Sequence, residues 1–236
     1  MAEDISPVLL RKVQKNFRAR IEKEGLTQSA MMKRARDGTF KSINLYTHKV
    51  GKALAYAYMD VLTPEALPDG TLFYNIAQKV LVPTLEEAHL MVSDVADAVM
   101  ETTYKRMGLG LKPIRPPIPM DRVDGIIDLL TDGFYADNIH YLNEPIRNLV
   151  DHFGDLHTQR NVEFMANSNV GFLLIRTAEP TCCDWCADRA GMYDDYWEAQ
   201  ANQVFARHEG CRCELILKRG DSSGKMATSG HAFVRS

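Results

Sequence analysis

The stretch PTCCDWCADRAG, residues 180–191, holds three of the five cysteines in a chain of 236 residues, and HEGCRC, residues 208–213, holds the other two. A C-x2-C pair in the first stretch and an H-x2-C-x-C triplet in the second supply five candidate metal ligands: Cys183, Cys186, His208, Cys211 and Cys213. A C-x2-C turn lets two thiolates face one point about 2.3 Å away, and a second cluster across a hairpin completes a tetrahedron. The spacing therefore predicts a structural metal site, and zinc is the metal that these ligands favour.

The supply of ligands exceeds the four that a tetrahedral site needs, because Cys182 adds a sixth group. Cys182 is the least expected ligand, since it is adjacent to Cys183 and would point away from it. We expect the C-x2-C pair and His208 to bind together with either Cys211 or Cys213. The spacing leaves the choice between these last two open.

Other roles for the cysteines fit the sequence less well. A thioredoxin-like redox pair would open a helix after a strand and would leave the remaining cysteines without a role. A base deaminase needs an H-x-E motif upstream of P-C-x2-C, whereas the His208-Glu209 pair is adjacent and lies downstream. A Cys–His nucleophile uses only two of these residues. Cysteines that pack without a metal, or that pair on oxidation, stay open as the alternative to a metal site.

Most of the first 170 residues show the three- and four-residue spacing of apolar side chains that predicts amphipathic helices. Ser6 is expected to cap the first helix and Gly25 to follow its end. Later, short apolar runs at 171–177 and 213–218 have strand character. The helices are expected over residues 6–24, 28–37, 41–62, 84–107, 121–132 and 144–167.

The fold class that follows is a mainly α N-terminal region and then a small α+β C-terminal domain with a Cys/His knuckle. The segment LKPIRPPIPM, residues 111–120, cannot be helical, because proline lacks the amide hydrogen and restricts the residue before it. It is compatible with a domain boundary and with a surface loop inside one domain. The expected organisation is a helical region at 1–110, a proline-rich linker or arm at 111–120, a helical connector at 121–170, the Cys/His domain at 171–218 and a flexible tail at 219–236.

Aromatic residues lie among or between the two cysteine groups, and we expect them to form a small core that the knuckle encloses: Trp185, Tyr193, Tyr196 and Trp197. Five histidines on or near helical segments are expected to be core or surface residues: His48, His89, His140, His152 and His157. The chain has no phosphate loop, no nucleophile elbow and no carboxylate pair suited to acid–base work. The sequence therefore predicts a protein that is not an enzyme.

The charge balance argues against a general attraction to nucleic acid or to anionic lipid, since the formal net charge is −3 and the pI is about 6.2. Two basic patches are local exceptions: residues 1–40, with nine Lys or Arg against five acids, and the C-terminal tail. No apolar stretch has the length of a membrane span, and the first residues lack the features of a signal peptide. We therefore expect synthesis in a cytoplasm and no membrane partner.

The two cysteine stretches, read as LIRTAEPTCCDWCADRAGMY and VFARHEGCRCELIL, resemble the C-terminal domain of the phage head morphogenesis proteins, the MuF-type minor head proteins. The family signature is C-x2-C, a glycine five residues later, a variable insert and H-x2-C-x-C entering a strand. Asp184 and Glu209 stand where the family often has proline. The resemblance covers about residues 173–217, and six positions match: Cys183, Cys186, Gly191, His208, Cys211 and Cys213.

The resemblance implies a minor capsid protein of a tailed phage or prophage, present in few copies inside the virion. Its partners would be the portal and other capsid proteins, and also packaged DNA where such a protein leaves the head with it. A second hypothesis is a zinc-knuckle nucleic-acid-binding regulator that uses the basic residues of 1–40 and of the tail. A third, an effector enzyme fused to a MuF-type domain, has little room after Cys213.

Overall fold

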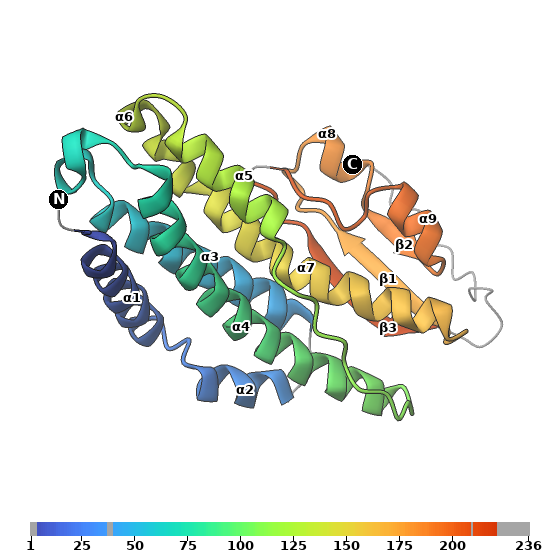
Figure 1. Cartoon of the computed structure of the whole chain (residues 1–236). Coiled ribbons are helices and arrows are strands. Elements are labelled where there is room, and N and C mark those ends of the chain that lie inside the picture. Colours follow the sequence, from blue (N-terminus) through green and yellow to red (C-terminus); the bar gives the residue numbers. More distant parts are fainter. Residues whose placement is uncertain (1–3, 37–39, 209, 221–236) are drawn as a thin grey trace.

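The computed structural model describes residues 4–36, 40–208 and 210–220, in which long helices form one layer and a three-stranded antiparallel sheet with short helices forms the other (Figure 1). The expected fold class is confirmed, since a mainly helical region precedes a small α+β unit that carries the Cys/His cluster. Within the described ranges, each helix is too short or too polar to span a lipid bilayer.

The long helices are α1 (Ser6–Lys23), α2 (Gln28–Arg36), α3 (Phe40–Val61), α4 (Tyr74–Arg106), α5 (Met120–Thr131) and α7 (Glu144–Asn167). The short elements are β1 (Phe172–Thr177), β2 (Gly191–Tyr193), β3 (Glu214–Arg219), α6 (Tyr135–Asn138), α8 (Asp184–Ala187), α9 (Tyr196–Ala201) and the 3-10 turns η1 (Pro64–Ala66), η2 (Pro68–Gly70) and η3 (Ile139–Leu142). Except for the start of α4, the predicted helices and the two predicted strands are confirmed to within about two residues. The short elements between them were not predicted.

The N-terminal cap of α1 differs from the one predicted. Ser6 is the first helical residue, and its amide donates to the carboxylate of Asp4 (Ser6 N to Asp4 Oδ1, 3.0 Å). The expectation that Ser6 caps this helix was therefore wrong, because Ile5 is the cap residue and the side chain of Asp4 accepts the first helical amide. The other end is as expected, with Gly25 at a positive φ of 62° just beyond the helix.

Helix α4 begins ten residues before the expected start and continues through Pro83. A proline inside a helix removes one hydrogen bond and crowds the preceding turn. Two hydroxyl groups bind carbonyls of that turn: Thr84 Oγ1 donates to Val80 O (2.8 Å), and Tyr58 of α3 donates to Leu81 O (3.2 Å). The expected start at residue 84 was wrong because contacts with α3 stabilise the turn that the proline weakens.

Helices α3 and α7 approach each other closely where glycines remove side chains. A Cβ atom added at Gly154 would lie 2.9 Å from Thr47 Cγ2, and one added at Gly51 would lie 3.1 Å from Arg147 Cα. Both distances are shorter than an ordinary van der Waals contact, so neither position has room for a larger residue. This close pair of helices forms the surface on which the sheet rests.

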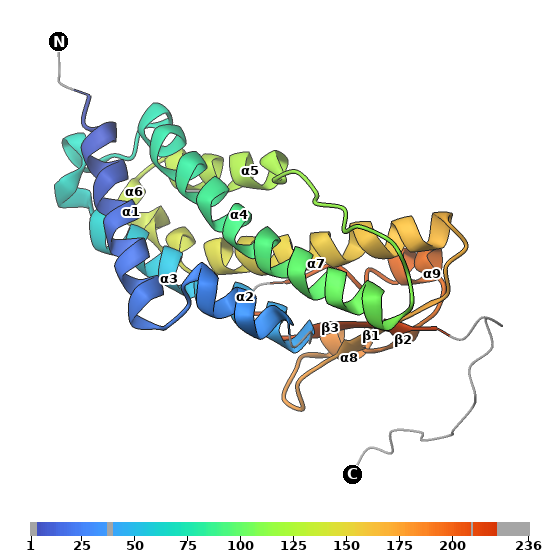
Figure 2. The same ribbon diagram turned by 90° about the horizontal axis from the view of Figure 1, so that it is seen from below.

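The sheet has the strand order β2-β1-β3, and α7 covers one of its faces (Figure 2). Leu174 of β1 pairs with Tyr193 of β2 on one side and with Leu217 of β3 on the other. These side chains belong to the same buried cluster as the apolar residues of α3, α4 and α7. The sheet therefore shares its core with the helices, and only the cysteines form a separate small cluster.

The proline-rich segment has no helix or strand between α4 and α5, as expected for its composition. Asn161 of α7 holds it through two backbone bonds: Asn161 Nδ2 donates to Ile114 O (2.9 Å), and Ile114 N donates to Asn161 Oδ1 (2.8 Å). Arg115 binds Asp94 and Asp97 of α4. The segment is thus fastened across α4 and α7. Of the flexible tail expected at 219–236, residues 221–236 lie outside the described part of the chain.

Candidate metal centre

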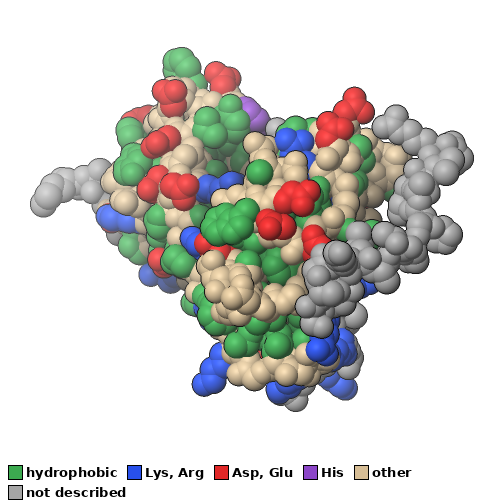
Figure 3. Space-filling view, turned by 90° about the vertical axis from the view of Figure 1, so that its right-hand side faces the viewer, with side chains coloured by type: hydrophobic (Ala, Val, Ile, Leu, Met, Phe, Trp, Pro, Cys, Tyr) green, Lys and Arg blue, Asp and Glu red, His purple; other side chains and the backbone are tan. Residues whose placement is uncertain are grey.

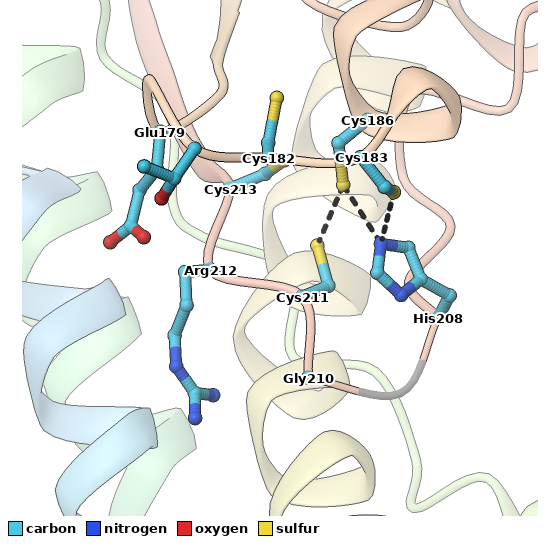
Figure 4. A pocket seen from close by; sticks show the side chains of 10 residues that line it. Glu179, Cys182, Cys183, Cys186, His208, Gly210, Cys211, Arg212 and Cys213 are labelled. Atoms are coloured by element: carbon cyan, nitrogen blue, oxygen red, sulfur yellow. Dashed lines mark hydrogen bonds between the residues drawn. The ribbon is translucent and has the colours of Figure 1, made fainter.

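The C-x2-C pair is placed by the first turn of α8. Cys183 stands at the N-terminal cap of this helix, and its carbonyl accepts the amides of Cys186 (3.0 Å) and Ala187 (3.0 Å). A single tight turn follows in the second stretch, where the Cys211 amide donates to His208 O (3.1 Å). Each cysteine group therefore turns back on itself, and the two turns face each other beside β3 (Figure 4).

The predicted ligands converge in space. The Nε2 atom of His208 lies 3.3 Å from Cys183 Sγ and 2.9 Å from Cys186 Sγ, and the sulfur atoms of Cys186 and Cys211 are 3.7 Å apart. In a tetrahedral zinc site, two thiolates lie about 3.8 Å apart and a thiolate and an imidazole nitrogen about 3.6 Å apart. The sulfur–sulfur distance matches this geometry. The histidine contacts are a few tenths of an ångström shorter, so the ring would move out slightly around an ion.

All five residues predicted as ligands belong to two overlapping groups, and Cys186 is in both. One group joins Cys183, Cys186 and His208, and the other joins Cys186, Cys211 and Cys213; within each, the ligand atoms lie within 4.8 Å of one another. Cys186 is therefore the ligand that the two groups share. These groups are close enough to hold a metal ion.

Cys182 is outside both groups. Its side chain points away from the other thiols in Figure 4, as its position next to Cys183 predicted. The same view shows Glu179, which lines the cavity of about 250 Å³ above the cluster but points away from the sulfur atoms. Among the residues that the structure describes, no carboxylate joins either group of ligands.

Protonation differs among the three buried cysteines, Cys186, Cys211 and Cys213. A hydrogen bond from the Cys213 thiol lowers the pKa of Cys211 to about 4, and the nearby guanidinium groups of Arg207 and Arg176 act in the same direction. Burial raises the pKa of Cys186 to about 11, and the thiolate of Cys211 raises the pKa of Cys213. Without a cation, these three buried cysteines therefore comprise one thiolate, Cys211, and two thiols. Binding a metal would release protons from the thiols.

Arg176 supplies positive charge beneath the cluster. It lies on β1 with 3% of its surface exposed, donates from Nη1 to Ala206 O (2.8 Å) and brings Nη2 to 3.7 Å from Cys211 Sγ. The guanidinium groups of Arg176 and Arg189 both lie over the Trp185 ring, at 5.4 and 3.7 Å from its centre, and this ring meets the His208 ring edge-on at 5.2 Å. A Cys₃His zinc site carries a net charge of about −1, which a buried arginine beside it would offset.

Two arginines beside the ligands join the cluster to the helices. Arg207 binds both carboxylate oxygens of Asp155 on α7, with Nη2 2.9 Å from Oδ1. Arg212 brings Nη1 to 3.4 Å from Nδ1 of His48 on α3, and the same ring nitrogen lies 3.6 Å from the carboxylate of Asp151. Sequence reasoning missed these contacts. The available signal was the pair of aspartates one turn apart on α7, Asp151 and Asp155.

The aromatic residues do not form the separate core that was expected. Trp185 packs on the cysteine cluster, but Trp197 is 61% exposed. Tyr193 and Tyr196 are buried in the core shared with the helices. The prediction was wrong because Tyr193 of β2 and Tyr196 of α9 pack into the buried cluster that the sheet shares with the long helices, and only Trp185 packs on the cysteines.

Three of the five histidines expected to be core or surface residues are buried: His89, His152 and His157. His157 is fully enclosed, and its Nε2 lies 2.6 Å from Asp97 Oδ1. His48 is half-buried at the junction described above, and His140 is exposed.

Comparisons with known proteins leave this site as the main guide to function. Scans against models of protein families, the curated proteins and the solved structures each find no match for this chain. The resemblance to the MuF-type proteins therefore rests on the motif residues themselves.

Proposed function

We propose that the chain is a minor capsid protein of the MuF type, acting in the head of a tailed phage or prophage. The observation that carries the proposal is the convergence of the motif residues: the ligands of both stretches, 25 residues apart at Cys183 and His208, meet within 3.3 Å. A chance match in spacing would not be expected to bring the matched side chains to one point. In this role the protein would reside inside the virion, with the portal and other capsid proteins as partners.

Zinc is the ion we propose for the cluster. Thiolates and imidazole together favour zinc, whereas calcium and magnesium prefer oxygen ligands. Five protein ligands more than fill a tetrahedral site, so none of its positions is needed for water or substrate. The zinc would therefore be structural: it would close the loops around α8 and β3, and the chain would have no catalytic role.

The nucleic-acid-binding hypothesis has weaker support. Two of the basic residues counted toward it are already engaged, because Arg18 binds Glu87 of α4 and Arg20 binds Asp60 of α3. Paired guanidinium groups attract phosphate less than free ones do. We therefore retain DNA as a partner only in the sense of packaged DNA near the portal.

Quantitative mass spectrometry of purified virions tests the proposed function. Particles from the phage or induced prophage that encodes the chain should contain it in a fixed and low ratio to the major capsid protein. A mutant phage without the gene should form heads with altered composition or reduced infectivity. If the chain is absent from washed particles, and its deletion changes neither head yield nor infectivity, the proposal is overturned.

A further inference from the structure

We infer that one end of the molecule, where α4, α7 and β3 all finish, binds duplex DNA through its phosphates and without regard to base sequence. This surface consists of residues 103–113, 164–171 and 215–220, and we call it the basic end. The inference is carried by the charge, exposure and placement of these residues. Only the identification of the duplex as packaged DNA rests on the proposed function.

The basic end joins three segments that are far apart in the sequence. Tyr104, in the last turn of α4, donates to the side chain of Asn161 near the end of α7 (2.9 Å), so these two helices finish together. Strand β3 finishes beside them, because Arg219 pairs with Phe172, which lies just beyond the end of α7. In Figures 1 and 2 the three elements end at the same side of the molecule.

Positive charge is concentrated at the basic end. Its three segments contain five Lys or Arg and no Asp or Glu, whereas the whole chain has a net charge of −3. All five cations are exposed: Lys105, Arg106, Lys112, Lys218 and Arg219. Figure 3 looks onto this end and shows Lys and Arg gathered in its lower part, with Asp and Glu above them. The chain is therefore acidic as a whole and basic at this one place.

Most of these cations are not engaged elsewhere in the protein. Lys105, Lys112, Lys218 and Arg219 form no ion pair within the part of the chain that the structure describes, in contrast to the two arginines of α1 that bind α3 and α4. Unpaired cations on a surface can neutralise phosphates and release the counterions that surround a nucleic acid. Their charge is therefore available to a polyanion.

Stabilisation of helix ends explains only part of this arrangement. Cations in the last turn of a helix complement the partial negative charge of its terminal carbonyls, which accounts for Lys105 and Arg106. It does not account for Lys112, which lies on the proline-rich segment, or for the two cations that end β3. A shared ligand at this end explains all five.

Neutral hydrogen-bonding side chains lie between the two groups of cations. Helix α7 packs against both α4 and the sheet, and its end carries three consecutive exposed polar residues, Asn167, Ser168 and Asn169. In protein–DNA interfaces, phosphate oxygens are bound by Ser and Asn side chains as well as by Lys and Arg. The basic end therefore offers both kinds of donor to a phosphate backbone.

The composition of the basic end favours a duplex over other anionic partners. None of the exposed large hydrophobic side chains in the described structure belongs to its segments. Protein interfaces are anchored by aromatic and apolar side chains, and interfacial membrane binding uses apolar side chains that enter the bilayer. Proteins that bind single strands stack the bases on aromatic rings. A duplex presents its phosphates outward and needs none of these features.

Fluorescence anisotropy with a labelled DNA duplex of random sequence tests the inference on the full chain. If each of the five cations neutralises one phosphate, the logarithm of the association constant should fall with the logarithm of the NaCl concentration at a slope of about −4.5. Lys105→Gln/Lys112→Gln removes two charges from the helical side, and Lys218→Gln/Arg219→Gln removes two from the sheet side. Each variant should make the slope shallower by about 2 and weaken binding at least about tenfold at about 50 mM NaCl. Circular dichroism should show that both variants fold normally, since the changed side chains are exposed.

A matched control comes from α1, on the opposite side of the molecule in Figure 1. Lys12→Gln/Lys15→Gln also removes two exposed charges and should bind the duplex as the unmodified chain does, whereas a loss equal to that of the other variants would overturn the basic end as the site. Tighter binding to a single strand of the same length, or to vesicles of phosphatidylserine and phosphatidylcholine, would overturn the duplex as the ligand. If the unmodified chain does not bind the duplex at about 50 mM NaCl, the inference is overturned. The proposed function would then still stand, because its test is the presence of the chain in virions.

Discussion

Arg207 and Asp155 form a two-pronged ion pair that is almost fully removed from solvent, with 5% and 4% of their side chains exposed. Arg207 immediately precedes the candidate ligand His208, and Asp155 lies on α7. Burial raises the pKa of Asp155, and the guanidinium of Arg207 opposes that change. The pair therefore makes the position of a metal ligand depend on the helical layer.

Removing one partner of this pair should be costly. Arg207→Met leaves the carboxylate of Asp155 buried without its cation, and the loss of a partner from a buried pair costs about 3–5 kcal/mol. The double variant Arg207→Met/Asp155→Leu should recover most of the loss, because it removes both charges. Urea unfolding would measure the four free energies of the cycle. As a control, Arg160→Met at an exposed pair with Glu163 should cost no more than about 1 kcal/mol.

Metal binding should depend most on Cys186, the residue that both ligand groups share. Native mass spectrometry of reduced protein, purified without chelator, should show one zinc per chain. Cys186→Ser should abolish it, and Cys211→Ser or Cys213→Ser should reveal which of the two is the fourth ligand by the larger loss. Cys182→Ser is the control and should keep the zinc. A metal-free mass, with every thiol open to alkylation, would instead mean that the cysteines only pack.

Local features of the site could be predicted from the sequence because each cysteine turn spans only a few residues. The spacing around Cys183 and His208 fixes which side chains can meet a metal. The ion pair between Arg207 and Asp155 could not be predicted in this way, because its partners are 52 residues apart and charges on a loop have no periodic pattern. The same is true of β2, whose three residues find their register only against β1.

In the helical layer, too, some features could be predicted from the sequence and others could not. Apolar spacing predicted most helix bounds, since each helix buries one continuous side. It failed at Pro83, where a hydroxyl of α3 compensates for a weakened turn of α4. It also did not show that the proline-rich segment is fastened by Asn161, because that bond depends on how α4 and α7 pack.

The Asn161 side chain should contribute strongly to stability. It is fully buried, holds both backbone groups of Ile114 and accepts a hydrogen bond from Tyr104 (2.9 Å). Asn161→Leu would leave the buried hydroxyl of Tyr104 unsatisfied, at about 1–3 kcal/mol, and would also remove the two part-buried hydrogen bonds to the backbone of Ile114. We expect a lower unfolding midpoint and faster proteolysis within residues 111–119. Asn202→Leu at the exposed end of α9 should change neither, and equal effects of the two variants would contradict this role for Asn161.

Acid should destabilise the protein in part through His152 of α7, which is 7% exposed. Burial, together with the positive charges of Arg122 and Arg207, lowers its pKa to about 4. In the unfolded chain the pKa returns to about 6.5. Between these values the unfolded state binds more protons than the folded state does, so the free energy of unfolding should fall as the pH decreases from about 6.5 to about 4. The difference between the two pKa values corresponds to about 3 kcal/mol.

The variant His152→Met isolates this contribution, because methionine is apolar, flexible and close in length to histidine. Urea unfolding at pH 7, 6, 5 and 4 should show a smaller loss of stability for the variant than for the unmodified chain, and the gap should grow as the pH falls. The exposed His140 gives the control, since His140→Met should leave the pH dependence unchanged. Parallel curves for the unmodified chain and His152→Met would mean that this histidine is not held neutral in the folded state.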